Sequence, residues 1–438
     1  MLRFKSQSTF AVLVSHSSTP MQWIIPKTLN NHYQLAYGQC YFHKGISSSS
    51  IPSNHHPDEN IVTEIHPQGA AQFFSCYSSA QFAIPTTHTH KPKWIQVPQL
   101  LKSCKYVLDN EIKTPQQIPI EIVKQVHDHE YVERFLNGTI THKEMKRWGF
   151  ESGWNEQVRN RVLHTIGATL CATQDALFHN YSRRSSNLAG GGHHAFHSKG
   201  GGYCIWNDII IAGQYLINSG FCTNGRKYLV IDLDVHQGDG TARLARDLHE
   251  GKSFTFSMHC KHNFPEHKEK SDWDIELENG MKDDQYLKIL EKCLFTLEQE
   301  FKEKIDFIFY QSGVDVLEGD RLGLLCLSPA GVLRRDQMVV EFAERMAQHD
   351  PKFNRSHGLH MNGIPLISMM GGGYIRSENG NPLERVAQAH AETVNTLRNH
   401  WKSNQNARSR FILPLQQQVN YERTGRWRQE MDDRPQVY

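Results

Sequence analysis

Short apolar segments alternate with amphipathic ones along the second half of the chain. Four runs rich in Val, Ile, Leu and Phe, without polar alternation, have the pattern of strands in a parallel sheet that is covered on both faces. These runs lie at residues 228–233, 254–258, 307–310 and 366–370. Segments with helical periodicity separate and flank them, at residues 208–217, 284–301, 329–347 and 382–400. The alternation predicts an α/β fold with an open, mostly parallel central sheet and helices on both faces.

Helical patterns without strand patterns dominate the chain before residue 200. Short ones lie at residues 97–108, 119–126 and 131–136, and a long one lies at 155–179. In the long segment, apolar residues recur at spacings that place them on one buried face. These residues are Val158, Val162, Ile166, Leu170 and Leu177.

The two ends of the chain differ from the segment between them. Residues 1–80 lack sustained periodicity, and residues 403–438 are polar and carry several arginines. We therefore expect an N-terminal extension (1–80), a folded domain (81–402) and a C-terminal tail (403–438).

The N-terminal residues and the cysteines indicate in which cellular compartment the protein is expected. Residues 1–57 contain no Asp or Glu and only four Lys or Arg, which is compatible with an organelle transit peptide and equally with a disordered extension. The nine cysteines form no C-x-x-C pair, which argues against a disulfide framework and a thiolate zinc site. We expect an intracellular protein, in the nucleus or cytoplasm, or in a mitochondrion or plastid if residues 1–57 are a transit peptide.

The overall charge and hydropathy exclude two classes of partner. Lys and Arg number 48 against 46 Asp and Glu, so the formal net charge is +2. Such a balance provides no strong field for binding nucleic acid. The longest apolar runs are far shorter than the ~20 residues of a membrane-spanning helix. We expect neither direct nucleic-acid binding nor association with a membrane.

Polar groups stand where three of the predicted strands end. Asp232, Asp234 and His236 follow the first run, Asp315 follows the third, and a glycine triplet ending at Tyr374 follows the fourth. In open parallel sheets the carboxyl ends of strands share one edge, where ligands bind. Asp234 and His236 are two residues apart and would face the same side of an extended chain. With Asp315 they form a sensible three-ligand set for Zn²⁺ that leaves one position open for water.

Two adjacent histidines, His193 and His194, follow three glycines upstream. Adjacent imidazoles can accept and donate protons beside a metal site, and each needs a carboxylate to fix its tautomer. Asp232 and Asp239 are available for that purpose. Each of these signals alone has a structural explanation, as a helix cap, a turn or a surface pair. Their combination, in order and at strand ends, favours a catalytic site.

The sequence resembles the histone deacetylase family, in the arginase/deacetylase superfamily. The resemblance rests on the segments NLAGGGHHAFHSKGGGYCIWND, LVIDLDVHQGDGTA, FTFSMHCKHNFP, GVDVLEGDRLGLLCLSPAG and MMGGGY. The upstream segment VHDHEYVERFLNGTITHKEMKRWGF is similar to bacterial-type deacetylases close to class IV. The match covers about residues 92–400, so the resemblance makes 81–402 a deacetylase catalytic domain with the arginase/deacetylase fold.

The resemblance also implies roles for individual residues. The implied zinc ligands are Asp234, His236 and Asp315, and Tyr374 is the hydroxyl that binds the developing oxyanion. His193 would pair with Asp232 and His194 with Asp239 in handling protons. Tyr203 and Phe264 match the aromatic walls of a channel for an acyl-lysine side chain of a protein or peptide, histones included. Ser257 and Met258, with residues 232–236, match a structural K⁺ site.

Two positions depart from the family pattern. Many relatives have Phe where Tyr203 stands, so the channel rim gains a hydroxyl that bears on the choice of acyl group. Many relatives have a bulky or hydroxyl residue just before the tandem histidines, where this chain has Gly192. Neither departure removes a catalytic group.

Several alternatives stay open at this stage. A dimanganese ureohydrolase of the arginase type would need further carboxylates where Gly238 and Leu317 stand, which disfavours it. A non-catalytic acyl-lysine-binding protein would keep the same motifs. The substrate could also be a small acetylated amine such as a polyamine. Acetyl and longer acyl groups are not distinguished, and the oligomeric state is not indicated.

Overall fold

Eight strands form one sheet in the computed structural model, which describes residues 73–82, 92–353, 363–374 and 382–407. Every pairing among these strands is parallel, and their order is β2-β1-β3-β8-β7-β4-β5-β6. The strands are β1 (Ser75–Tyr77), β2 (Ile112–Lys113), β3 (Arg184–Asn187), β4 (Lys227–Asp232), β5 (Ser253–Cys260), β6 (Trp273–Leu277), β7 (Ile305–Gln311) and β8 (Leu366–Met369). The predicted fold class, a parallel sheet flanked by helices, is confirmed.

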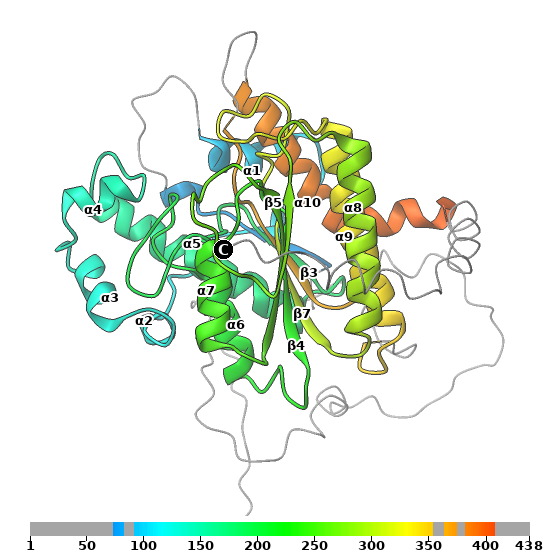
Figure 1. The fold of residues 1–438 in the computed structure, drawn as a ribbon, viewed down its shortest axis with the longest axis horizontal. Coiled ribbons are helices and arrows are strands. Elements are labelled where there is room, and N and C mark those ends of the chain that lie inside the picture. The colour runs from blue at the N-terminus through cyan, green and yellow to red at the C-terminus, as the bar shows by residue number, and fades with distance from the viewer. Residues whose placement is uncertain (1–72, 83–91, 354–362, 375–381, 408–438) are drawn as a thin grey trace, which may run out of the picture. The chain divides into compact units, whose positions relative to one another are not determined.

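Helices cover both faces of this sheet (Figure 1). On one face α1, α10, α9 and α8 pack in succession, and on the other α5, α6 and α7 do so. The helices are α1 (Lys93–Ser103), α2 (Ile120–Val123), α3 (His129–Leu136), α4 (His142–Arg147), α5 (Glu156–Gln174), α6 (Asp208–Asn218), α7 (Asp239–Leu248), α8 (Asp283–Glu300), α9 (Pro329–Gln348) and α10 (Pro382–Ala407). Within the described ranges, none of them has both the length and the apolar character that crossing a bilayer requires.

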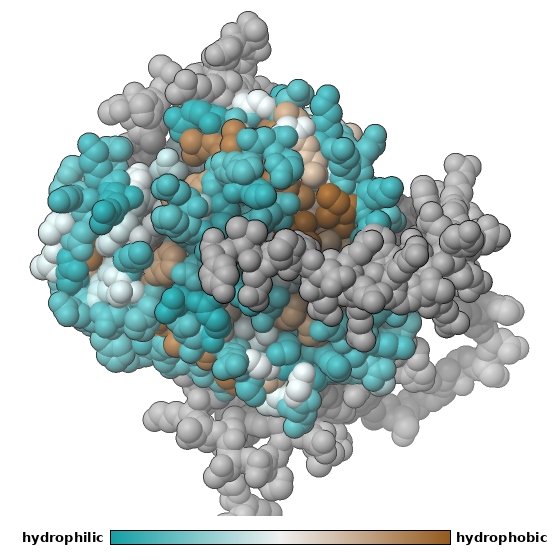
Figure 2. Space-filling view, viewed as in Figure 1, coloured by the Kyte–Doolittle hydropathy of each residue, from teal (hydrophilic) through white to brown (hydrophobic). Residues whose placement is uncertain are grey.

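The central strands are buried because they are apolar on both sides. All seven residues of β7 are buried, and so are five of the six in β4. A strand between two helical layers meets apolar side chains on each face, so it reads as a continuous hydrophobic run. The face of the molecule shown in Figure 2 is mostly hydrophilic, as expected when these runs lie inside.

The elements that the sequence predicts match the structure best at the centre of the sheet. The four predicted strands correspond to β4, β5, β7 and β8, and the four predicted helices beside them correspond to α6, α8, α9 and α10. The short or polar strands β1, β2, β3 and β6, and the helices α4 and α7, are additional. Two limits of the expected domain also differ: the sheet already includes β1, before residue 81, and α10 continues past residue 402.

Candidate active site

The candidate site lies at the carboxyl ends of neighbouring parallel strands. Asp232 ends β4 and pairs with Gln311 at the end of β7, which in turn pairs with Met369 at the end of β8. Because the three strands run in the same direction, the residues that follow them leave the sheet at one edge. The structure thus brings together the segments that carry the predicted ligands and Tyr374.

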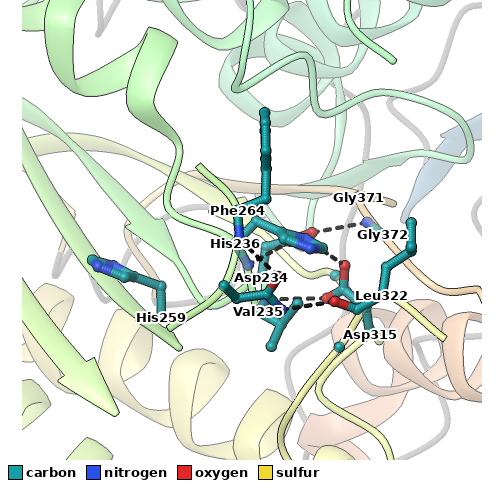
Figure 3. Close-up of polar contacts among 12 residues, drawn as sticks. Asp234, Val235, His236, His259, Phe264, Asp315, Leu322, Gly371 and Gly372 are labelled. Carbon is teal, nitrogen blue, oxygen red and sulfur yellow. Dashed lines mark hydrogen bonds and ion pairs between the residues drawn. The ribbon is translucent and has the colours of Figure 1, made fainter. Parts of the chain in front are cut away.

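Asp234, His236 and Asp315 form a buried cluster (Figure 3). The Nδ1 atom of His236 lies 3.1 Å from Asp234 Oδ1 and 3.1 Å from Asp315 Oδ2. One ligand atom from each residue falls within 4.8 Å of the others. Backbone groups hold the two carboxylates: Val235 N donates to Asp315 Oδ1 at 3.0 Å, and Gly372 N donates to Asp234 Oδ2 at 2.8 Å.

The cluster fits a divalent cation such as zinc. Asp315 Oδ2 is buried and accepts no hydrogen bond of good geometry; its ion-pair neighbour is His236 Nδ1, itself a candidate ligand, and a cation between them would satisfy both groups. Burial and the neighbouring Asp234 carboxylate raise the pKa of Asp315 to about 6. Glycine keeps the space around the carboxylates open, since a Cβ at Gly372 would lie 1.7 Å from Asp315 Oδ2. Two carboxylates and one imidazole are donors that catalytic zinc accepts.

The tandem histidines each contact one carboxylate. His193 Nδ1 lies 2.8 Å from Asp232 Oδ2, and His194 Nδ1 lies 2.7 Å from Asp239 Oδ1. The two imidazole rings are themselves 4.1 Å apart, centre to centre. The structure therefore contains both His–Asp pairs that the family resemblance implies, with all four side chains buried.

The two imidazoles differ in proton affinity. Burial acts to lower the pKa of His193, but the carboxylates of Asp232 and Asp234 outweigh it and raise the pKa to about 9. Burial lowers the pKa of His194 to about 4, and the charge on His193 acts in the same direction. One imidazole is thus suited to carry a proton near neutral pH and the other to accept one.

Tyr374 reaches the site from the segment after β8. Burial raises the pKa of its phenol well above the ordinary range, and the Asp315 carboxylate adds to this effect, so the hydroxyl stays protonated and can donate a hydrogen bond. The ring of Tyr374 is 5.8 Å from that of Tyr203, centre to centre, and Lys93 Nζ lies 5.2 Å from its centre.

Tyr203 and Phe264 are large aromatic side chains that remain exposed. Their exposed fractions are 51% and 47%, and the Phe264 ring meets the His194 ring edge-on at 4.8 Å. In Figure 3 the Phe264 ring extends away from the ligand cluster. Apolar faces beside a reactive centre suit the alkyl stem of a substrate.

Gly238 and Leu317, which weigh against a ureohydrolase, and Gly192, which departs from the family pattern, have structural roles. A Cβ at Gly238 would lie 2.4 Å from Asp232 Oδ2, so the His193–Asp232 pair leaves no room for a side chain there. A Cβ at Gly192 would lie 2.3 Å from the carbonyl oxygen of Trp206. Leu317 is fully buried in the hydrophobic core. Packing of the surrounding residues explains why glycine and leucine occupy these positions.

The residues matched to a monovalent-cation site lie next to β4. Ser257 pairs with Asp232 in the register of β4 and β5, and Met258 follows it. The Ser257 hydroxyl shares a hydrogen bond of 2.9 Å with His259 Nδ1. K⁺ at this place stays a prediction.

Three residues of the site are not among those predicted. Asp208 accepts hydrogen bonds from the backbone N–H groups of Gly191 (3.0 Å) and Gly192 (2.6 Å), just before the tandem histidines. Lys93 Nζ donates to the Gly371 carbonyl at 2.6 Å, and Asp320 accepts from the Tyr374 N–H. A carboxylate five residues after Asp315 is a visible signal for Asp320, but nothing in the sequence pairs it with Tyr374.

The sequence of this chain is similar to that of one protein family. The family model of the histone deacetylase domain matches residues 88–393. An uncharacterized protein of Picosynechococcus is 36% identical over 295 residues, which cover 67% of this chain and 89% of that protein. Histone deacetylase 2 of Arabidopsis thaliana is 26% identical over 313 residues, which cover 70% of this chain and 74% of that protein.

Solved structures share the fold. The crystal structure of an HDAC homologue from Aquifex aeolicus and that of an HDAC homologue complexed with SAHA each superpose with a TM-score of 0.58 at 20% identity. Each comparison covers 75% of this chain and 84% of the other. With the family model matching well over half of its length, this chain belongs to the histone deacetylase family, whose members are hydrolases.

Proposed function

We propose that this protein is a zinc-dependent hydrolase that removes acetyl or longer acyl groups from lysine side chains of proteins or peptides, histones among them. The observation that carries the proposal is the buried Asp234–His236–Asp315 cluster, in which one ligand atom from each residue lies within 4.8 Å of the others. The two His–Asp pairs and Tyr374 support it, because side chains suited to bind a metal, to carry protons and to stabilise an oxyanion would then act in one site.

Asp234, His236 and Asp315 would hold the zinc ion. Zinc in such a site polarises an acyl carbonyl and makes water easier to deprotonate. Of the two histidines, His194 has the lower pKa, so its imidazole is the one available to accept a proton from the attacking water. His193, held charged by Asp232, is placed to give a proton to the leaving amine.

The protonated hydroxyl of Tyr374 would donate a hydrogen bond to the oxyanion that forms when water attacks the acyl carbon. Such a donor is effective because it is already oriented when the charge develops.

The rim residues bear on the acyl group. Phe264 offers an apolar face to an alkyl stem, while the Tyr203 hydroxyl adds a polar group at the mouth. The two exposed rings would admit acetyl-lysine and longer acyl-lysines. A structural K⁺ near Ser257 and Met258 would support the segment that carries Asp232 and Asp234.

The experiment compares wild type with Tyr374→Phe on lysine peptides bearing acetyl to long-chain acyl groups, with zinc and after chelation. We expect turnover that chelation abolishes, and a loss of kcat of about 10²- to 10³-fold in the variant. Tyr106→Phe is the matched control, because that hydroxyl bonds Glu392 on α10 and should leave kcat unchanged. Unchanged turnover in Tyr374→Phe would contradict the role of this hydroxyl.

Two other outcomes would replace the proposal. Turnover of acetylated polyamines but of no peptide would identify a small-amine deacetylase on the same site. Binding of acyl-lysine peptides without turnover, by zinc-loaded protein, would identify a non-catalytic reader.

A further inference from the structure

The Asp320 side chain accepts three backbone hydrogen bonds at the edge of the site. Its Oδ1 atom accepts from Leu322 N and Gly323 N, each at 2.9 Å. Its Oδ2 atom accepts from Tyr374 N at 2.5 Å. The first two bonds are local, within a turn, whereas the third joins segments 54 residues apart in the chain.

The segment that carries Tyr374 has little intrinsic stiffness. Residues 371–373 are three glycines, and Gly371 and Gly373 have φ angles of +65° and +146°. Glycine reaches such angles without steric cost, and for the same reason it does not by itself hold the chain there. The orientation of the Tyr374 side chain therefore depends on bonds from other segments.

Several such bonds hold the glycines, but the one made by Asp320 holds Tyr374 itself. Lys93 Nζ donates to Gly371 O at 2.6 Å, and Gly372 is held by Asp234 and Val314. These contacts lie two or three residues before the tyrosine. The Asp320 carboxylate contacts the amide of Tyr374, directly beside the Cα atom from which the phenol projects.

The same carboxylate also connects to the channel wall. Leu322, whose N–H binds Asp320, accepts from Asn263 Nδ2 at 2.7 Å through its carbonyl. Asn263 Oδ1 accepts from the N–H of Phe264 at 2.7 Å. These hydrogen bonds connect the Asp320 side chain to both Tyr374 and Phe264.

We propose that Asp320 is a positioning residue, which sets the place of the Tyr374 hydroxyl relative to the acyl channel. This inference rests on the proposed function, in which that hydroxyl stabilises the oxyanion. Misplacement by about 1 Å can cost on the order of 100-fold in rate, because preorganised groups work only in the aligned geometry.

Asp320→Asn is a selective test. The amide oxygen of asparagine can still accept the two hydrogen bonds within the turn. Its NH₂ group then faces the N–H of Tyr374, and because an NH₂ group is a donor, it cannot accept that hydrogen bond. Asp272→Asn is the matched control. Asp272 also accepts a backbone N–H from a distant segment, Thr255 N at 2.8 Å, but it joins β5 to the residue before β6 rather than parts of the site.

The first measurement is amide hydrogen exchange in the peptide that contains residues 370–374, with zinc-loaded protein. We expect exchange to accelerate at least about tenfold in Asp320→Asn and to stay unchanged in Asp272→Asn, because only the former loses a bond of this segment. Unchanged exchange in Asp320→Asn would overturn the proposal. This readout does not depend on enzymatic activity.

The second measurement is a double-mutant cycle with Tyr374→Phe. We expect Asp320→Asn alone to lower kcat by about 10- to 100-fold with little change in KM, and to cost little more once the hydroxyl is gone. An equal loss in both backgrounds would show a general structural role and overturn the proposal. If wild type deacylates no substrate, the proposed function fails, while the exchange result still decides whether Asp320 holds the Tyr374 segment.

Discussion

Strands β4 and β7 gather buried carboxylates at both of their ends, with opposite electrostatic results. At the amino ends, Asp306 accepts hydrogen bonds from Arg226 Nε at 2.5 Å and from Lys352 Nζ at 2.7 Å. Asp350 accepts one from Arg226 Nη2 at 2.6 Å. Despite burial, these cations lower the pKa of Asp306.

At the carboxyl ends the carboxylates lack such partners. Among the described residues, the ion pairs of Asp232, Asp234 and Asp315 are all with histidines. Burial, with the nearby Asp234 charge, raises the pKa of Asp315 instead of lowering it. The amino-end carboxylates are paired with an arginine and a lysine, whereas those of the site have only imidazoles as ion-pair partners among the described residues, and a metal ion would supply the fixed positive charge. The same residue type thus serves structure at one end and function at the other.

Asp315→Asn should have the largest effect. The substitution keeps the shape of the side chain but removes the charge and a ligand oxygen, so we expect loss of bound zinc and a fall in deacylation well beyond the ~100-fold typical for supporting residues. Metal content and turnover are the measurements. The same change at the other end, Asp306→Asn, is the control and should leave metal content intact. If the Asp315→Asn variant bound one zinc per chain and kept full turnover, Asp315 would not be a zinc ligand and the proposed difference between the two strand ends would be wrong.

Arg226→Met should act on stability alone. It deprives Asp350 of its cation and Asp306 of one of two, which leaves buried charge uncompensated and should lower the free energy of unfolding by about 3 kcal/mol. Urea denaturation measures this change, and zinc content should match wild type. Reduced metal binding in a folded variant would mean that the two ends are coupled.

The stabilising effect of zinc should depend on pH. The folded-state pKa of Asp315, about 6 without metal, lies above its unfolded value near 4, so the folded metal-free protein binds the proton more tightly. Its contribution to stability is therefore lost as pH rises through about 4 to 6. Zinc needs the ionised carboxylate, so the Tm difference between zinc-loaded and chelated protein should grow over this range. A constant difference would contradict the assignment of Asp315 as a ligand.

The amino-end cluster predicts the opposite sign in acid. Because the pKa of Asp306 is lowered, its contribution to stability is present above its unfolded value and is lost as pH falls through the folded one. Arg226→Met should weaken this acid dependence, as measured by Tm below about pH 4. An acid limb identical to that of wild type would show that Asp306 does not contribute to it.

Lys352→Met should have the smallest effect. The Lys352 side chain is 33% exposed and Arg226 still contacts Asp306 in its absence. Partly solvated ion pairs contribute little, so we expect at most about 1 kcal/mol of destabilisation in urea. A loss equal to that of Arg226→Met would show that the lysine, rather than the arginine, compensates the buried charge.

The central strands could be predicted from the sequence, and the peripheral ones could not. Strand β7 is predicted by its own run of apolar residues. Strand β3 is Arg-Ser-Ser-Asn, yet all four residues are buried, because the hydroxyls of Ser185 and Ser186 bond Ser75 and Ser368 on the adjacent strands. Those partners lie more than 100 residues away in the chain, so no local pattern indicates the strand.

The site divides in the same way. The α/β pattern already predicted that Asp234, His236, Asp315 and Tyr374 would lie close together, because each of them follows one of the parallel strands. The environment of each group follows only from the folded structure: Asp315 is paired with an imidazole, Asp306 is paired with an arginine and a lysine, and Asp320 holds the backbone of Tyr374. The physical reason is that pKa and orientation depend on neighbours within a few ångströms, and folding draws those neighbours from segments far apart in the chain.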